Sequence, residues 1–283
     1  MSPDGVALAA RGLGKVHRGR WVLRDCAFLV PAGRVAALVG GNGAGKSTLL
    51  GALAGVLAPD TGEVRVADGA RVAFVAQDKP LYPHFSVREM LRLGRALNRV
   101  WDQGRAERWL ERFGVPLGRA CGKLSGGERA QVALALAAGS CPSVLLLDEP
   151  LSELDPLARR EVTRELLTEV ADTGMTVLVS THAVAELDGV ADYLLLLERG
   201  RLRVEGDIDD LLAAHLRYAG PRSATAPVPG EVVEARHAGG RSEFLLRVPL
   251  GTVAPETEPC WAPRPVTLED LVLAHLTNAR GGN

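Results

Sequence analysis

The stretch Gly40-Gly41-Asn42-Gly43-Ala44-Gly45-Lys46-Ser47 follows a short apolar run, Arg34–Val39, and precedes a helical pattern of leucines. Its glycines allow successive backbone N–H groups to turn inward and form an anion cradle at a helix N-terminus. Lys46 adds a positive charge for the β- and γ-phosphates of a nucleotide, and Ser47 offers a hydroxyl to Mg²⁺. With a strand before it and a helix after it, the stretch predicts a phosphate-binding loop rather than a chance run of glycines.

Strands and helices alternate on both sides of this loop. Apolar runs typical of buried strands lie at Val72–Val75, Val144–Leu147 and Thr176–Ser180, and helical patterns separate them. From Ser86 to about Phe113 the pattern is helical throughout, which predicts a helical insert. This alternation favours an α/β fold with a mainly parallel sheet that is covered on both faces.

A second motif ends the apolar run Val144–Leu147, where Asp148 and Glu149 follow directly. Adjacent strand residues point to opposite sides, so we expect the two carboxylates to have different roles. Asp148 is suited to the Mg²⁺ shell, and Glu149 to polarising a water in line with the γ-phosphate. Taken alone, an acidic pair at a strand end is more often a solvated terminus. A phosphate-binding loop in the same chain favours the catalytic interpretation.

A third motif is Leu124-Ser125-Gly126-Gly127-Glu128, which precedes a helical pattern. Ser125 and Glu128 have the spacing of a capping box, a purely structural device that opens a helix. The same helix start presents a serine hydroxyl, two glycine amides and the positive end of the helix dipole. It therefore also suits a second phosphate contact.

In this order along the chain, the motifs resemble those of ATP-binding cassette (ABC) ATPases. The resemblance covers about Val6 to Leu212 and is carried by these segments: GGNGAGKST at 40–48, Gln77, LSGGE at 124–128, LLLDEP at 145–150, SELD at 152–155 and STH at 180–182. It implies a phosphate-loop nucleoside-triphosphatase core with an antiparallel N-terminal β subdomain, an α-helical insert and a small C-terminal α+β extension.

The resemblance also implies a mechanism. Two cassettes pack head to tail, so that each ATP lies between the phosphate loop of one copy and Ser125–Gly127 of the other. The implied catalytic residues are Lys46, Gln77, Glu149 and His182, and the implied Mg²⁺ residues are Ser47, Gln77 and Asp148. The implied ATP-binding residues are His17, Gly40, Gly41, Asn42, Gly43, Ala44, Gly45, Lys46, Ser47, Thr48, Ser125, Gly126, Gly127 and Asp155. Considered alone, Gln77 and His182 are weak signals, because a single histidine after a strand is more often structural.

Several residues depart from the family pattern. Gly41 stands where proline is common, and Glu128 where glutamine is common. Glu153 replaces a small residue in the loop that crosses the dimer interface, which adds charge there. His17 aligns where the family usually places an aromatic residue on adenine, and an imidazole offers less stacking area. Trp21 is nearby but is expected to belong to the following strand.

Composition limits the class of protein and its location. A formal net charge of −1 gives no footprint for nucleic acid, and no apolar run approaches the roughly 20 residues that span a bilayer. Four scattered cysteines and the lack of a secretion signal favour a reduced, cytoplasmic protein. The resemblance adds a separate membrane permease as partner, and hence a position at the cytoplasmic face of the membrane.

We divide the chain into a cassette, residues 1–216 with a helical subdomain at about 82–140, and a linker with a small extension, residues 217–283. Pro221, Pro227 and Pro229 suggest the linker, and a final helix is expected to start near Thr267. Its apolar face needs a surface to pack on.

Three functions remain open: the motor of a transporter, an ATPase that regulates a cell-envelope complex, and a degenerate assembly module. The complete set of motifs disfavours the third. Within transport, the stretch Phe85–Leu134 resembles cassettes of exporters that have a separate permease, so export of a small molecule is expected, with import as the alternative.

Overall fold

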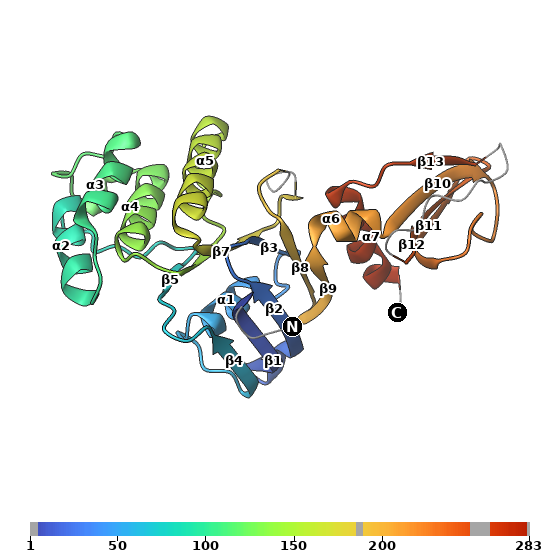
Figure 1. Ribbon diagram of the computed structural model, residues 1–283, viewed down its shortest axis with the longest axis horizontal. Coiled ribbons are helices and arrows are strands. Elements are labelled where there is room, and N and C mark those ends of the chain that lie inside the picture. Colours follow the sequence, from blue (N-terminus) through green and yellow to red (C-terminus); the bar gives the residue numbers. More distant parts are fainter. Residues whose placement is uncertain (1–4, 185–188, 250–260, 282–283) are drawn as a thin grey trace.

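The computed structural model describes residues 5–184, 189–249 and 261–281, and it contains a central sheet flanked by two smaller sheets (Figure 1). The central sheet has the strand order β5-β6-β7-β3-β8-β9. Neighbouring strands from β5 to β8 are parallel, and β9 adds an antiparallel edge. The bounds are β5 Val72–Val75, β6 Val144–Asp148, β7 Thr176–Thr181, β3 Val35–Val39, β8 Tyr193–Glu198 and β9 Arg201–Asp207. The mainly parallel sheet predicted from the sequence is confirmed.

An antiparallel sheet of order β2-β1-β4 covers one face of the central sheet, and the helix after the phosphate loop lies between them. Its elements are β1 Val6–His17, β2 Arg20–Pro31, β4 Thr61–Val66 and the helix α1 Lys46–Leu53. Leu49 and Leu50 of α1 are fully buried against Leu38 of β3 and Leu146 of β6. This packing fixes the start of α1, and with it the loop that precedes the helix.

The helical insert forms one end of the molecule (Figure 1). It consists of α2 Val87–Leu97, α3 Gln103–Arg112 and α4 Gly126–Gly139. The helix α5 Pro156–Thr173 lies next to α4, on the side toward β7 and β3. Ser86 and Glu89 form a capping box at the start of α2. The indole N–H of the buried Trp109 in α3 donates to Gln131 of α4 at 2.9 Å, which joins the two helices.

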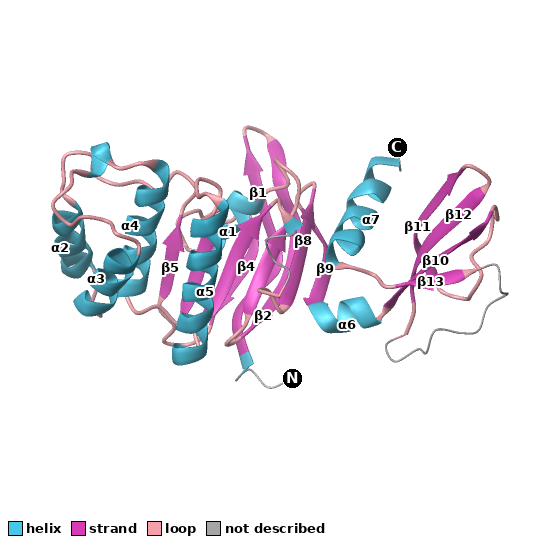
Figure 2. Cartoon of the chain, turned by 90° about the horizontal axis from the view of Figure 1, so that it is seen from above, coloured by secondary structure: helices cyan, strands magenta, loops and turns pink. Residues whose placement is uncertain are grey.

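The C-terminal part forms the opposite end of the molecule. It contains α6 Ile208–Ala213, β10 His215–Pro221, β11 Glu231–Ala238, β12 Arg241–Arg247, β13 Ala262–Arg264 and α7 Leu268–Gly281, with sheet order β11-β12-β10-β13. Thr267 and Asp270 exchange the hydrogen bonds of a capping box, so the predicted start of the last helix is confirmed. Viewed from above, α7 lies between the central sheet and the C-terminal sheet (Figure 2). Its Leu271 and Val272 pack on Val39 and Leu194.

One expectation about this region is wrong. The linker predicted from Arg217 begins only after Pro221, because residues 215–221 form β10, which pairs with both β12 and β13. The side chain of Arg217 is buried and lies near Glu243 and Asp270. A strand that contains arginine, glycine and proline does not look apolar in the sequence. The division of the chain at residue 216 stays a prediction.

Candidate active site

The phosphate loop leaves β3 and enters α1 with a backbone that requires glycine. Gly43 and Gly45 have φ angles of 76° and 108°, a region that residues other than glycine rarely adopt. A Cβ on Gly40 would collide with the carbonyl oxygen of Leu197, and one on Gly45 would lie 2.9 Å from Leu23. At Gly41 a Cβ would meet nothing within 4 Å, so the space beside this residue is open.

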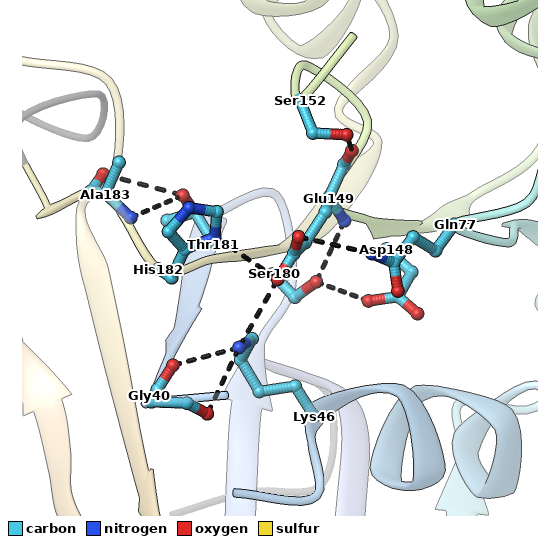
Figure 3. Close-up of polar contacts among 11 residues, drawn as sticks. Gly40, Lys46, Gln77, Asp148, Glu149, Ser152, Ser180, Thr181, His182 and Ala183 are labelled. Carbon is cyan, nitrogen blue, oxygen red and sulfur yellow. Dashed lines mark hydrogen bonds and ion pairs between the residues drawn. The ribbon is translucent and has the colours of Figure 1, made fainter. Parts of the chain in front are cut away.

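The carboxylate of Glu149 lies where three polar side chains from separate segments meet (Figure 3). The Nζ of Lys46 and the Nδ1 of His182 each lie 3.4 Å from Oε1 of Glu149. Gln77 donates from Nε2 to the other carboxylate oxygen at 3.4 Å. Lys46 also donates to the carbonyl oxygen of Gly40 at 2.9 Å. The structure therefore brings together the four residues expected to be catalytic, and they line one hollow with Asn42–Thr48.

Glu149 follows β6 in a strained backbone conformation, with a φ of 45°. The hydroxyl of Ser180 accepts from the N–H of Glu149 at 3.0 Å and donates to Oδ1 of Asp148 at 2.7 Å. Ser180 is fully buried and Asp148 nearly so. One hydroxyl thus fixes both carboxylate residues, and the two line different hollows: Glu149 that of the phosphate loop and Asp148 the one beside α1.

The residues expected at Mg²⁺ are compatible with such an ion. Ser47, Gln77 and Asp148 line one hollow beside α1. A hydroxyl, an amide and a carboxylate are oxygen donors of the type that Mg²⁺ takes, with water and phosphate completing its shell. Within residues 5–184, 189–249 and 261–281, no group of three or more His, Cys, Asp or Glu side chains could hold a metal ion.

Ser125–Gly127 begin α4 in a second hollow, which also contains Glu153 and Asp155. Ser125 and Glu128 form the predicted capping box, in which the Ser125 N–H donates to Glu128 at 2.9 Å. This hydrogen bond and the nearby Arg119 guanidinium hold the pKa of Glu128 below its ordinary value. As far as the structure describes their linings, this hollow and that of the phosphate loop share no residue.

Two of the residues expected to bind nucleotide, Asp155 and His17, are not among the described residues that line the phosphate-loop hollow. Asp155 is the N-cap of α5, where its Oδ1 accepts from Leu157 and Ala158 at 2.9 and 3.0 Å. His17 ends β1 at an exposed turn and is not among the described residues that line the phosphate-loop hollow. Its contact with adenine stays a prediction.

Sequence reasoning missed two residues of the site. Val22 of β2 lines the phosphate-loop hollow, and no sequence signal marks it. The sequence places Ser180 in the STH segment without indicating a role, because that role depends on the register in which β7 places it beside Asp148 of β6. That register is a tertiary property.

None of the helices in the described part of the chain combines the length and apolarity that a membrane span requires.

Comparison with known proteins agrees with this site. The family profile described as "ABC transporter" matches residues 23–152, which include the phosphate loop, Gln77, Ser125–Gly127 and Glu149. The aliphatic sulfonates import ATP-binding protein SsuB of Shigella flexneri serotype 5b (strain 8401) is 35% identical over 254 residues, covering 86% of this chain and 96% of that protein.

The molybdenum import ATP-binding protein ModC of Mycobacterium tuberculosis (strain ATCC 25618 / H37Rv) is 37% identical over 224 residues, covering 71% of this chain. The match spans 61% of that relative's length. A solved structure described as "Structure of ATP binding subunit of ABC transporter" superposes with a TM-score of 0.65 at 28% identity, covering 72% of this chain and 91% of that one.

Proposed function

Because this chain belongs to the ABC transporter family of ATP-binding proteins, we propose that it hydrolyses ATP to drive import of a small solute through a separate membrane permease. The observation that carries the ATPase part is the contact of Lys46, Gln77 and His182 with the carboxylate of Glu149 beside the phosphate loop. The proposed location is the cytoplasmic face of the membrane.

The chemistry follows from this geometry. The loop amides and Lys46 bind the β- and γ-phosphates, and His182 contacts the γ-phosphate. A water held by Glu149 attacks the γ-phosphorus atom, while the bond to the oxygen that bridges to the β-phosphate breaks. Glu149 accepts the proton of the water, and ADP and inorganic phosphate result. Mg²⁺, held by Ser47 and Asp148 with Gln77 beside it, would neutralise charge on the phosphates.

The site is proposed to be complete only in a dimer of two copies, since Ser125–Gly127 lie in a separate hollow from the phosphate loop. In a head-to-tail dimer these residues of one copy would contact the γ-phosphate held by the other. Hydrolysis would then depend on closure of the pair, which is how ATP could drive movement in a bound permease.

We propose import in place of the export that the helical insert led us to expect. The relatives ModC and SsuB are both named for import, at 37% and 35% identity, whereas the resemblance of Phe85–Leu134 to exporters concerns one segment. Their two solutes differ, so no substrate is assigned to this chain.

The direction of transport can be tested without knowing the solute. Cells that carry the wild-type chain are compared with cells that carry Glu149→Gln, by untargeted mass spectrometry of cell contents and growth medium. Import predicts a solute that the variant leaves in the medium, with at least a tenfold loss of uptake, because the variant binds ATP but does not hydrolyse it. A solute that accumulates inside the variant cells would establish export, and unchanged profiles would count against transport.

A further inference from the structure

The carboxylate of Glu153 lies next to the start of α4. A Cβ placed on Gly126 would lie 2.5 Å from Oε2 of Glu153 and 3.2 Å from its Cδ. Gly126 is the first residue of α4, whose opening N–H groups have no partner within the helix. Glu153 therefore brings a negative charge to the place where the positive end of the helix is exposed.

A buried lysine holds this carboxylate. The Nζ of Lys79 lies 3.8 Å from Oε1 of Glu153 and donates to the carbonyl oxygen of Gln77 at 3.0 Å. The side chain of Lys79 is 1% exposed, whereas that of Glu153 is 42% exposed. A fixed cation thus meets a carboxylate that is free to swing toward solvent. The contact joins the Gln77 segment to the loop before α5, although 74 residues separate Lys79 from Glu153.

This arrangement conflicts with the closed dimer. Under the proposed function, on which this inference rests, the γ-phosphate bound by a second copy must reach Ser125–Gly127. Phosphate and the carboxylate of Glu153 are both negative and would occupy neighbouring positions at one helix end, so their repulsion opposes closure. Glu128, Asp155 and Glu161 line the same hollow, with Arg112 as its basic residue, and Glu128 accepts from the N–H of Ser125 at 2.9 Å. The three heavy atoms nearest to the Cβ position of Gly126 all belong to Glu153.

We propose that Glu153, held by Lys79, is an autoinhibitory carboxylate that covers Gly126 in the single chain and must swing away before two copies close on ATP. The pair sets the ATP concentration at which the dimer forms. Because Lys79 also bonds the Gln77 carbonyl, movement of the Gln77 segment releases Glu153.

The test uses the full chain with Glu149→Gln, which separates dimer formation from hydrolysis. Analytical ultracentrifugation gives the MgATP concentration at which half of the protein is dimeric. Glu153→Gln, which keeps the side-chain shape and removes the charge, should lower this midpoint by about three- to tenfold. High salt screens charge repulsion, so about 0.5 M NaCl should narrow the difference to less than about twofold.

Two further variants make the test specific. Asp172→Asn removes a carboxylate near the far end of α5, roughly 24 Å along the helix from Pro156, and should leave the midpoint unchanged.

Lys79→Met should lower the midpoint, and adding Glu153→Gln to it should change the value by less than about twofold. A midpoint that Glu153→Gln does not lower would overturn the inference, and a full additional effect in the Lys79→Met background would remove Lys79 from it. If the Glu149→Gln protein formed no dimer at any ATP concentration, the proposed function itself would fail.

Discussion

Ser180 is fully buried between the two carboxylate residues at the end of β6, and its hydroxyl contacts both. Ser180→Ala leaves Oδ1 of Asp148 and the N–H of Glu149 without this partner, which should cost about 1–3 kcal/mol of folding stability. We expect kcat for ATP hydrolysis to fall about 10- to 100-fold, since a group that orients a metal-binding carboxylate is lost. The Kd for ATP should stay within about twofold, because Lys46 and the loop amides are intact.

The matched control is Thr168→Ala, which removes an exposed hydroxyl on α5 that donates to Arg164. It should alter neither kcat nor the unfolding midpoint. Steady-state hydrolysis, equilibrium nucleotide binding and urea unfolding together check the prediction. A Ser180→Ala enzyme with wild-type kcat would show that Asp148 and Glu149 are positioned without this hydroxyl.

Residues within one local motif could be predicted from the sequence, whereas partners from separate segments could not. Lys46 and the glycines follow from the spacing of the phosphate loop, because a tight turn before a helix has few solutions. The contact of Ser180 with Asp148 depends on the pairing of two strands 32 residues apart, which no local pattern specifies. The position of Glu153 over Gly126 likewise brings together two separate segments of the chain.

At the scale of elements, α7 attaches the C-terminal part to the central sheet. Leu271 is fully buried against Ala37 and Leu196, while its neighbour Leu273 is 45% exposed. Leu271→Ala should lower the free energy of unfolding by about 2–5 kcal/mol, because it leaves a cavity at this contact. Leu273→Ala is the control on the same helix and should stay within about 0.5 kcal/mol.

Urea unfolding followed by circular dichroism compares the two variants. Equal small losses would mean that α7 rests on the sheet without contributing to its stability. An equally large loss in Leu273→Ala would instead point to a further surface that covers the exposed face of the helix.

The elements that sequence patterns predicted are those with one dominant signal. The buried strand β6 is a continuous apolar run, and α7 begins with a capping box. The bounds of β1 could not be predicted within the expected N-terminal β subdomain, because its register shifts repeatedly against β2 and breaks the alternation of buried residues. The face that covers the predicted apolar stripe of α7 could not be named, since it comes from β3 and β8, far away in the sequence.

At the scale of the whole molecule, the phosphate loop and Ser125–Gly127 line separate hollows of one chain. The proposed function therefore requires a second copy, and complementation between two inactive variants tests this. Lys46→Ala disables the phosphate-loop half, and Ser125→Arg blocks the α4 half. In a mixed dimer of the two, one site combines both damaged halves and the other combines both intact halves.

Each variant alone should hydrolyse ATP at no more than about 1% of the wild-type rate, since Lys46 and Ser125 are each proposed to contact the γ-phosphate in every site. A one-to-one mixture should recover about a quarter of the wild-type activity, because about half of the dimers are mixed and each of these has one working site of two.

The control is Lys46→Ala mixed with Glu149→Gln. These residues lie 3.4 Å apart in the same chain, so their defects fall on the same half and no mixed dimer has an intact site. Recovery in the control would mean that Lys46 and Glu149 serve different sites of the dimer. No recovery in the first mixture would mean that each chain hydrolyses ATP with its own residues alone. That result would require Ser125 to reach the phosphate loop within one copy, by a rearrangement of the helical insert far larger than the swing of one glutamate side chain.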